Sequence, residues 1–256
     1  MTPQWIGKVE SYLLRRVREE GFAHISLLDP ENFSAQEVRT VAREVEEAGS
    51  DAIMVGGSTA ADSFMLRDLI DSIKSSSNLP VILFPNNVSS VVPNADAIWF
   101  MSLLNSTNPY YIVGAQALAA PLIKKYSIEA IPMAYLIIGE GKAAGFVGDV
   151  KPFPRDKPSL VAAFSLAAEL LGFRFVYLEA GSGAESPVPT EMVRVVRNTT
   201  EKVHLIVGGG IREGSQIAEL VKAGAEIIVT GTLIELSGPN KLSLLLKEAR
   251  SILSLA

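Results

Sequence analysis

Short runs of apolar residues alternate with amphipathic segments along almost the entire chain. The runs are rich in Val, Ile, Leu and Ala and are bounded by Gly, Pro, Asn or Asp, a pattern typical of buried strands. We expect strands at residues 24–28, 52–55, 81–84, 97–103, 130–138, 173–178, 203–207 and 226–230. Apolar residues recur every three or four positions between most of these runs, which predicts helices. The helices are expected at 34–49, 62–75, 110–126, 158–171, 190–198, 213–222 and 240–253.

Three segments depart from this alternation. Residues 85–94, between the third and fourth strands, are rich in Asn, Ser and Pro and are too few for a crossover helix. Residues 3–20 place Trp5 and Val9 at helical spacing, which predicts an extra amphipathic helix over the floor of the sheet. Residues 139–154 contain four glycines but no convincing periodicity, and they are expected to form a long functional loop.

The order of the elements favours a parallel sheet, because parallel neighbours need a crossover connection and that crossover is nearly always right-handed. Eight strand-helix units in 256 residues match the size at which such a sheet closes on itself. We therefore expect an α/β fold. It is a single (β/α)8 TIM barrel spanning residues 1–256, modified by loss of the third crossover helix and carrying an extra N-terminal helix.

Composition narrows the classes of function. Hydrophobic residues make up 48% of the chain, charged residues make up 20%, and the formal net charge is -5. A nonspecific nucleic-acid binder relies on clustered Lys and Arg, so this charge argues against one. The sequence has no cysteine, which excludes disulfides and thiol catalysis and fits a cytoplasmic protein. No apolar segment reaches the roughly 20 residues needed to span a bilayer, so we expect no transmembrane segment.

Three consecutive strand ends carry glycine-rich tips. The sixth strand runs into Tyr-Leu-Glu-Ala-Gly-Ser-Gly-Ala at 177–184, the seventh into Gly-Gly-Gly at 208–210 and the eighth into Gly-Thr at 231–232. Glycine lets a ligand approach the backbone closely, and the loops after strands seven and eight of such barrels commonly bind phosphate. We expect one composite anion site built from backbone N–H groups, although a glycine run alone can also serve a turn.

Two carboxylates stand at strand tips and could take part in chemistry. Glu179 shares the inward phase of its strand with Tyr177, and a buried Glu can accept a proton from a hydroxyl or hold that hydroxyl. The alternative for Glu179 is an exposed acid that caps the following turn. Asp29 and Ser58, at the first and second tips, would suit Mg²⁺, with helix capping as the alternative. His24 opens the first strand, so we expect it at the lower rim, away from the active ends.

The motifs together resemble those of the geranylgeranylglyceryl phosphate synthase family. They are Leu-Leu-Asp-Pro at 27–30, Val-Gly-Gly-Ser at 55–58, Tyr-Leu-Glu-Ala-Gly-Ser-Gly-Ala at 177–184, Val-Gly-Gly-Gly-Ile-Arg at 207–212 and Thr-Gly-Thr at 230–232. The resemblance extends over nearly the whole chain, whereas each glycine run alone occurs in other phosphate-binding barrels. It implies a modified barrel without the third crossover helix, in agreement with the short connection described above.

The resemblance also implies a prenyltransferase reaction. The 3-hydroxyl of sn-glycerol 1-phosphate would attack C1 of geranylgeranyl diphosphate, release diphosphate and form the first ether bond of archaeal membrane lipids. By the same resemblance, Mg²⁺ would be held through Asp29 and Ser58, and Glu179 and Tyr177 would be the catalytic residues. The implied glycerol 1-phosphate site comprises Tyr177, Leu178, Glu179, Ala180, Gly181, Ser182, Gly183, Gly208, Gly209, Gly210, Gly231 and Thr232.

Two positions depart from the family pattern, and one region should hold the prenyl tail. Many relatives carry Lys two residues before the metal-binding Asp, where this chain has Leu27. Some relatives are expected to carry Asn at the position of Thr232 in this chain. Thr232 can keep the backbone contact with the ligand while its side-chain hydrogen bond differs. The prenyl tail needs an apolar groove, and the missing third helix would open one near Phe84 and Trp99.

Three other functions are compatible with parts of this sequence pattern. A bacterial-type heptaprenylglyceryl phosphate synthase would use the same motifs with a longer donor. A phosphate-binding barrel isomerase, synthase or aldolase would share the phosphate cradle, but no Lys lies centrally in any expected strand, which argues against Schiff-base chemistry. A noncatalytic lipid-phosphate binder would have no need to keep Asp29, Ser58 and Glu179 together. We also expect a homo-oligomer, a dimer or hexamer, formed through apolar outer positions such as residues 110–112.

Overall fold

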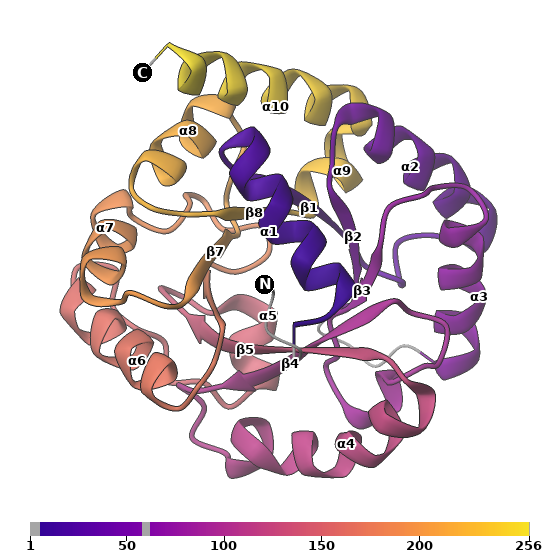
Figure 1. Cartoon of the computed structure of the whole chain (residues 1–256), viewed down its shortest axis with the longest axis horizontal. Coiled ribbons are helices and arrows are strands. Elements are labelled where there is room, and N and C mark those ends of the chain that lie inside the picture. The colour runs from indigo at the N-terminus through magenta and orange to yellow at the C-terminus, as the bar shows by residue number, and fades with distance from the viewer. Residues whose placement is uncertain (1–5, 58–61, 256) are drawn as a thin grey trace.

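Eight parallel strands close into a barrel in sequence order, with each strand paired to its neighbours in the chain and β8 paired to β1 (Figure 1). The computed structural model describes residues 6–57 and 62–255. The strands are β1 (Ala23–Leu28), β2 (Ala52–Val55), β3 (Val81–Leu83), β4 (Ala97–Leu103), β5 (Glu129–Ile137), β6 (Phe175–Glu179), β7 (His204–Gly208) and β8 (Ile227–Thr230). The TIM barrel expected from the sequence is confirmed.

The ring of helices around the barrel has one gap. Helices follow seven of the eight strands: α2 (Ala35–Ala48), α3 (Ser63–Lys74), α4 (Ala115–Tyr126), α6 (Pro158–Leu170), α7 (Thr190–Thr199), α8 (Gly214–Lys222) and α10 (Pro239–Ser254). Between β3 and β4 the chain forms a single 3-10 turn, η1 (Val88–Ser90), and no α-helix. The expected loss of the third crossover helix is therefore confirmed.

Local chemistry explains where the helices begin and end. Ser34 accepts a hydrogen bond from the backbone N–H of Glu37, and the Glu37 carboxylate accepts one in return from the Ser34 N–H, so α2 begins with a complete capping box. Gly49 then ends α2 with φ 101°, a left-handed conformation that residues with a Cβ resist. Of the helices in the described residues, none is long and apolar enough to cross a membrane.

Apolar side chains pack in two separate layers. Residues that point into the barrel, such as Ile25, Met54, Trp99 and Phe175, form the inner layer. Residues of the opposite phase pack beneath the helices, as Leu178 does on β6. Because successive side chains of a strand face opposite ways, this arrangement fixes which residues can reach the barrel interior.

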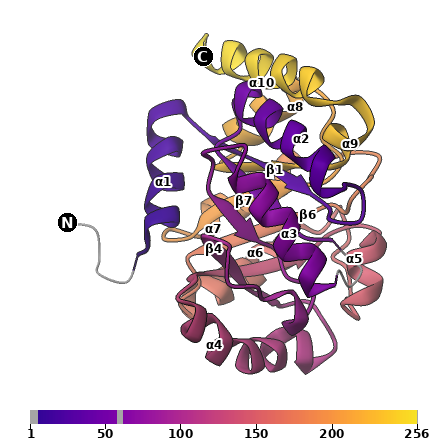
Figure 2. The ribbon, with the colours of Figure 1, turned by 90° about the vertical axis from the view of Figure 1, so that its right-hand side faces the viewer.

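Helix α1 (Lys8–Glu20) covers the floor of the barrel, at the end opposite the strand tips (Figure 2). Its buried Val9 and Leu13 join the inner apolar layer. The Glu129 carboxylate on β5 accepts hydrogen bonds from the backbone N–H groups of Val9 and Glu10, at 2.8 Å each, and so caps the start of the helix. The expected floor helix is confirmed from Lys8 onward, and Trp5 lies outside the described residues.

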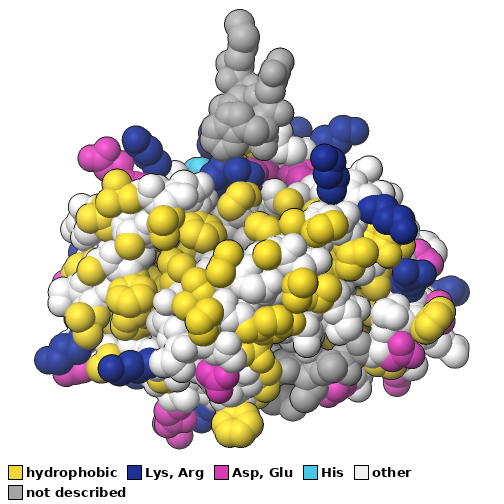
Figure 3. Space-filling model, turned by 90° about the horizontal axis from the view of Figure 1, so that it is seen from below, with side chains coloured by type: hydrophobic (Ala, Val, Ile, Leu, Met, Phe, Trp, Pro, Cys, Tyr) yellow, Lys and Arg dark blue, Asp and Glu magenta, His cyan; other side chains and the backbone are white. Residues whose placement is uncertain are grey.

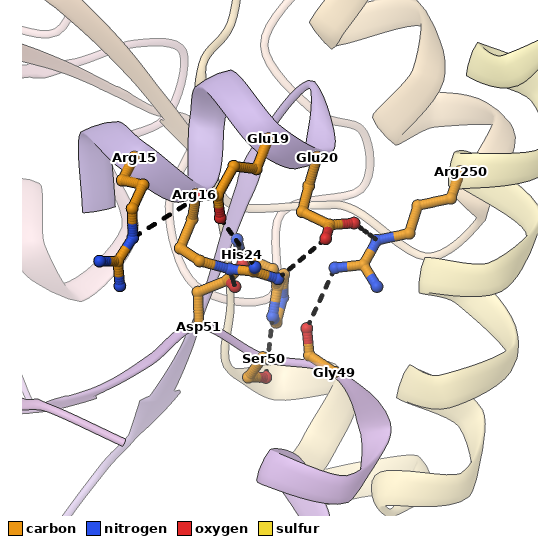
Figure 4. A network of polar contacts seen from close by, with 9 residues as sticks. All are labelled: Arg15, Arg16, Glu19, Glu20, His24, Gly49, Ser50, Asp51 and Arg250. Atoms are coloured by element: carbon orange, nitrogen blue, oxygen red, sulfur yellow. Dashed lines mark hydrogen bonds and ion pairs between the residues drawn. The ribbon is translucent and has the colours of Figure 1, made fainter. Parts of the chain in front are cut away.

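Polar contacts also join α1 to the first two strands (Figure 4). The Arg16 Nε donates to Asp51 Oδ1 at 2.6 Å, and Asp51 Oδ2 accepts the backbone N–H of His24 at 2.8 Å. Asp51 is 2% exposed, and the Arg16 guanidinium together with this backbone donor compensates its buried charge. Removing Arg16 would leave a buried carboxylate without its cation.

His24 lies near the amino end of β1, away from the strand tips as expected, but it is buried rather than exposed at the rim. It is 0% exposed and points outward from β1, where its ring nitrogens contact Ser50 Oγ at 3.0 Å and Thr230 Oγ1 at 2.9 Å. Burial lowers the pKa of His24 from 6.5 to about 3, with a further contribution from the Arg250 charge. The burial was not expected, because the expectation considered only distance along the strand and not the helices that cover its outer face.

The buried His24 should make stability depend on pH. Between about pH 3 and pH 6.5 the unfolded chain binds a proton at this ring and the folded chain does not, so stability falls as pH falls. One proton contributes a slope of about 1.4 kcal/mol per pH unit to the free energy of unfolding plotted against pH. Replacement by Gln should flatten the pH dependence of the free energy of urea unfolding in this window. An unchanged slope in His24→Gln would assign the pH dependence to other groups.

Two short helices were missed in the sequence. Residues 139–154, expected to be a loop, contain α5 (Lys142–Val147), and α9 (Thr232–Ser237) follows β8 directly. Both are too short to show a full hydrophobic period. Both also lie at the strand ends where the glycine-rich tips gather.

Candidate active site

The carboxyl ends of β6, β7 and β8 place the expected site residues around one opening. Tyr177 and Glu179 point into the barrel, because they occupy the phase opposite to Val176 and Leu178. Glu179 pairs in register with Gly208 on β7, so the acid lies beside the glycine run. Leu178 and Ala180 belong to the outer apolar layer, which leaves their backbone as the part that can face a ligand.

Glu179 is the buried acid of the site, with 6% of its surface exposed. Its Oε1 accepts the backbone N–H of Gly181 at 2.6 Å, and a hydrogen bond also joins its carboxylate to the Tyr177 side chain. Burial raises the pKa of Glu179, while the hydrogen bonds from Tyr177 and Gly181 oppose that rise. A carboxylate with a raised pKa is a better proton acceptor than a solvated one, so this group suits general base catalysis.

Two glycines at the end of β7, Gly208 and Gly209, each make room for one of these side chains. A Cβ on Gly208 would lie 2.2 Å from the Tyr177 hydroxyl, and one on Gly209 would lie 2.4 Å from Glu179 Oε1. Gly209 also has φ 83°, a conformation that favours glycine. The glycine run therefore has the structural role considered from the sequence, and its role in binding an anion stays a prediction.

The tip of β6 meets the tip of β8 across the opening. Ser182 Oγ lies 3.0 Å from Thr232 Oγ1, and Thr232 is the first residue of α9. Gly181 and Gly183 have φ 101° and φ 69°, which turns the β6 loop back over the opening. This contact confirms the expectation from the sequence that the tips of β6 and β8 lie together.

Arg212 contacts the backbone of the β6 loop. Its Nη2 donates to the carbonyl oxygen of Ala184 at 2.9 Å, and its Nη1 donates to that of Glu185 at 2.5 Å. Arg155 donates from Nη2 to Ser186 Oγ at 3.0 Å and to the Pro187 carbonyl at 2.5 Å. Two guanidinium groups thus hold the second half of the loop, which leaves its first half facing the opening.

Asp29 lies on the other side of the opening, at the end of β1. Its Oδ1 accepts the backbone N–H of Glu31 at 3.0 Å, and burial raises the pKa of its carboxyl. Gly57 packs so closely that a Cβ there would lie 2.4 Å from Asp29 Oδ2. Ser58, its expected partner, lies outside the described residues.

The donors around Asp29 fit Mg²⁺ better than a metal that needs several protein ligands. Within residues 6–57 and 62–255 no group of three or more His, Cys, Asp or Glu side chains could hold a metal ion. Mg²⁺ usually takes one or two carboxylates and completes its shell with water and substrate phosphate oxygens. A single half-buried Asp facing a ligand cavity matches that requirement.

One cavity of about 270 Å³ joins these groups. It runs from the tips of β6, β7 and β8, past Asp29 and Phe84, to the outer face of β4, where Ile98 and Phe100 line it. Phe84 and Trp99, expected beside a prenyl groove, line the part of the cavity inside the barrel, because both belong to the inner layer. No Lys or Arg is among the described residues that line the cavity, and Leu27 occupies the position where a Lys was expected in relatives.

Tyr135 is a residue of the site that the sequence argument missed. Its ring centroid lies 5.1 Å from that of Tyr177 and 5.3 Å from that of Phe84, so three aromatic rings form the floor of the cavity. Burial and the nearby Glu179 raise the pKa of the Tyr135 hydroxyl well above its usual value. Its inward phase could have been read from the register, since Tyr135 pairs with Tyr177 across β5 and β6.

Comparison with known proteins agrees with this geometry. The model of the PcrB family matches residues 15–249. The geranylgeranylglyceryl phosphate synthase of Pyrococcus abyssi is 54% identical over 230 residues, which cover 90% of this chain and 91% of that protein. The enzyme of the same name from Thermococcus kodakarensis is 55% identical over 233 residues, 91% of this chain and 92% of that protein.

Solved structures show the same fold. The chain superposes with a TM-score of 0.90 on (S)-3-O-geranylgeranylglyceryl phosphate synthase from Thermoplasma acidophilum in complex with sn-glycerol-1-phosphate. That structure is 42% identical in sequence, and the match covers 95% of this chain and 98% of that chain. Thiamine phosphate pyrophosphorylase from Pyrococcus furiosus matches with a TM-score of 0.59 at 14% identity, covering 92% and 99% of the two chains, and supports the fold alone.

Proposed function

The chain belongs to the PcrB family, and from this membership we propose how its residues carry out the reaction. Its activity is the transfer of a prenyl group to glycerol phosphate, as the similarity to geranylgeranylglyceryl phosphate synthases indicates. The observation that best supports a specific donor and acceptor is the cavity, which joins a polar end lined by Glu179 and Thr232 to an apolar end along β4. An acceptor with a phosphate and a donor with an apolar tail would fit its two ends.

In the proposed reaction the acceptor is sn-glycerol 1-phosphate and the donor is geranylgeranyl diphosphate. The oxygen of the acceptor's 3-hydroxyl forms a bond to C1 of the donor while the bond from C1 to the diphosphate oxygen breaks. The diphosphate leaves with the bonding electron pair, and the hydroxyl proton passes to Glu179. Tyr177 holds the Glu179 carboxylate through their shared hydrogen bond.

The acceptor would bind at the glycine-rich tips. Backbone N–H groups at Gly209, Gly210 and Gly231 border the cavity and can donate to phosphate oxygens without a charged side chain. Ser182 and Thr232 add hydroxyls at the same place. Glu179, the last residue of β6, would then face the glycerol hydroxyls rather than the phosphate.

The donor's diphosphate would bind beside Asp29. We propose that Asp29, together with Ser58, holds Mg²⁺, which when bound neutralises negative charge on the leaving diphosphate. The absence of Lys and Arg from the described cavity lining supports this role, because no side-chain cation there can replace the metal. Asp29 would also orient the leaving group away from the acceptor site.

The prenyl tail would lie along the outer face of β4. In a complete barrel the third crossover helix would help to cover this face, and here the face is lined by Ile98 and Phe100 and bordered by Val88 and Ala119. Burying an allylic C₂₀ chain in such a groove is favoured by the hydrophobic effect at about 25 cal/mol per Å² of apolar surface. The groove therefore supplies the binding energy that positions C1 over the aromatic floor.

A substrate panel tests the proposal. The purified protein is incubated with Mg²⁺, with glycerol 1-phosphate or its mirror image glycerol 3-phosphate, and with farnesyl, geranylgeranyl or heptaprenyl diphosphate. We expect diphosphate release and ether formation to be fastest with glycerol 1-phosphate and geranylgeranyl diphosphate. Faster turnover of heptaprenyl diphosphate would support the longer-donor alternative, and no turnover of any pair would refute the proposed reaction.

We also propose that the protein forms a homo-oligomer. Apolar side chains spread over the face that carries α4 (Figure 3), and Val113 and Leu118 there are 62% and 61% exposed. The residues first considered, 110–112, are half-buried instead, and Tyr111 lines the cavity. Large exposed apolar areas are typical of protein interfaces. Light scattering that gives the mass of a monomer would contradict this proposal.

A further inference from the structure

The chain widens into a π-helix just before α4. The backbone N–H of Ala115 donates to the carbonyl of Tyr110, five residues earlier, so Tyr110–Gly114 forms a single π turn, η2. Such turns are rare, and they are found frequently at functional sites. Something must compensate for the carbonyl groups that the wide turn leaves without a helical donor.

Two side chains supply those donors. Ser102 Oγ on β4 donates to the Ile112 carbonyl at 2.6 Å, and Gln116 Nε2 donates to the Tyr111 carbonyl at 3.1 Å. The same Nε2 also lies 2.5 Å from the carbonyl of Met101, so Gln116 joins the turn to β4. The Gln116 Oε1 is buried without a hydrogen-bond partner among the described residues, a cost that a surface turn with no role would not need to carry.

The π turn reaches across the groove on the outer face of β4. Asn87, next to η1, and Tyr111, in the π turn, line the cavity from two separate segments, which we call its two walls. The Tyr110 hydroxyl donates to Asn87 Oδ1 at 2.6 Å and so connects the two walls. The rings of Tyr110 and Tyr111 lie edge to face with centroids 5.3 Å apart, which couples this bridge to the ring that faces the groove.

We propose that this Asn87–Tyr110 bridge, held in place by the π turn, determines which prenyl chains the donor groove accepts. The inference rests on the proposed function of the groove. Because the third crossover helix is missing, the two walls of the groove beside β4 belong to separate segments, η1 and the π turn. The hydrogen bond between Asn87 and Tyr110 joins these two segments next to Tyr111. A fixed distance between the two walls makes the groove fit a prenyl chain of one length better than chains of other lengths. A groove whose walls can move apart would discriminate less between prenyl chains.

Single-atom changes test the bridge. Tyr110→Phe removes the hydroxyl and keeps the ring, Asn87→Asp keeps an acceptor oxygen, and Tyr12→Phe on α1 is the matched control on the barrel floor. The measurement is kcat/KM for farnesyl, geranylgeranyl and farnesylgeranyl diphosphate, together with KM for glycerol 1-phosphate. We expect Tyr110→Phe to change the ratio of kcat/KM between donors by about three- to tenfold, the range of one hydrogen bond. Asn87→Asp should keep the wild-type ratio, and KM for glycerol 1-phosphate should be unchanged in every variant.

Deletion of Val113 provides a second, independent variant. Val113 is 62% exposed, and removing one residue should convert the π turn to an ordinary α-helical turn that rotates Tyr110 away from Asn87. The deletion should change the donor ratio in the same direction as Tyr110→Phe. Wild-type ratios in both variants would overturn the proposal, as would an equal loss with all donors accompanied by a raised KM for glycerol 1-phosphate.

Binding separates this inference from the proposed reaction. If the wild type turns over no donor, the proposed function fails, and the bridge is then tested with unreactive thiodiphosphate analogues of the same three prenyl chains. Affinities that depend on chain length in the wild type and lose that dependence in Tyr110→Phe support the bridge. Affinities that are the same in the two proteins contradict it.

Discussion

Replacing Glu179 with Gln should lower turnover by about 10²–10⁴-fold, the contribution typical of a positioned general base. Gln has the same shape and can still contact Tyr177 and Gly181, but it cannot accept the proton of the attacking hydroxyl. KM for glycerol 1-phosphate should change much less than kcat. Glu185→Gln is the matched control, because this acid lies exposed on the same loop. Wild-type turnover in Glu179→Gln would remove Glu179 from the proton transfer.

The same substitution should change how kcat and stability depend on pH. Burial raises the pKa of Glu179, so in the wild type kcat should fall as pH drops through that raised value and the carboxylate becomes protonated. The Gln variant should lack this limb of the profile. The folded chain binds this proton more tightly than the unfolded chain, so the wild type loses stability as pH rises through the window above 4.5. Glu179→Gln should therefore melt no lower than the wild type at neutral pH, even though it is nearly inactive.

Replacing Asp29 with Asn should have the second large effect. The proposed metal would neutralise charge on the leaving diphosphate, and its loss would remove several kcal/mol of transition-state stabilisation, or about 10²–10³-fold in kcat. Asn keeps the size of Asp and its contact with the Glu31 N–H, so the fold should be unaffected. Titration calorimetry with Mg²⁺ in the presence of diphosphate should show binding to the wild type and none to Asp29→Asn.

Glu31→Gln serves as the control for that substitution, because Glu31 is exposed on the same loop and its removal leaves the Asp29 carboxylate in place. It should bind Mg²⁺ and turn over substrate as the wild type does. Mg²⁺ binding of wild-type strength in Asp29→Asn would place the metal elsewhere, whatever the effect on rate.

The sequence predicted the barrel well because its signals are repeated and local. Strand ends such as Leu28 and Val55 are followed directly by Asp29 and Gly56, and the capping box at Ser34 marks a helix start without reference to the rest of the fold. The absence of the third crossover helix was equally visible, since it depended only on the length and composition of residues 85–94. Alternation on β6 placed Tyr177 and Glu179 inside the barrel for the same reason.

Features that depend on contacts between distant segments were not visible. The short α5 and α9 have no hydrophobic period to detect, and the π turn before α4 depends on donors from Ser102 and Gln116 that only the folded chain brings near. Tyr135 had the right phase but no motif around it. The burial of His24 was missed because it is produced by α10 and by the Ser50 and Thr230 side chains, which lie far from it in sequence.

The gap in the ring of helices also decides where the barrel opens first. β3 is three residues long and pairs with β4 only through Ile82 with Ala97 and Leu83 with Ile98, whereas β4 pairs with β5 along its entire length. Local opening begins where few buried contacts must be broken, so backbone amides of β3 should exchange hydrogen faster than those of β5 or β6. If a prenyl donor binds in the neighbouring groove, as proposed, it would contact both sides of this seam and slow that exchange, so that substrate binding would itself complete the wall of the barrel that the chain leaves thin.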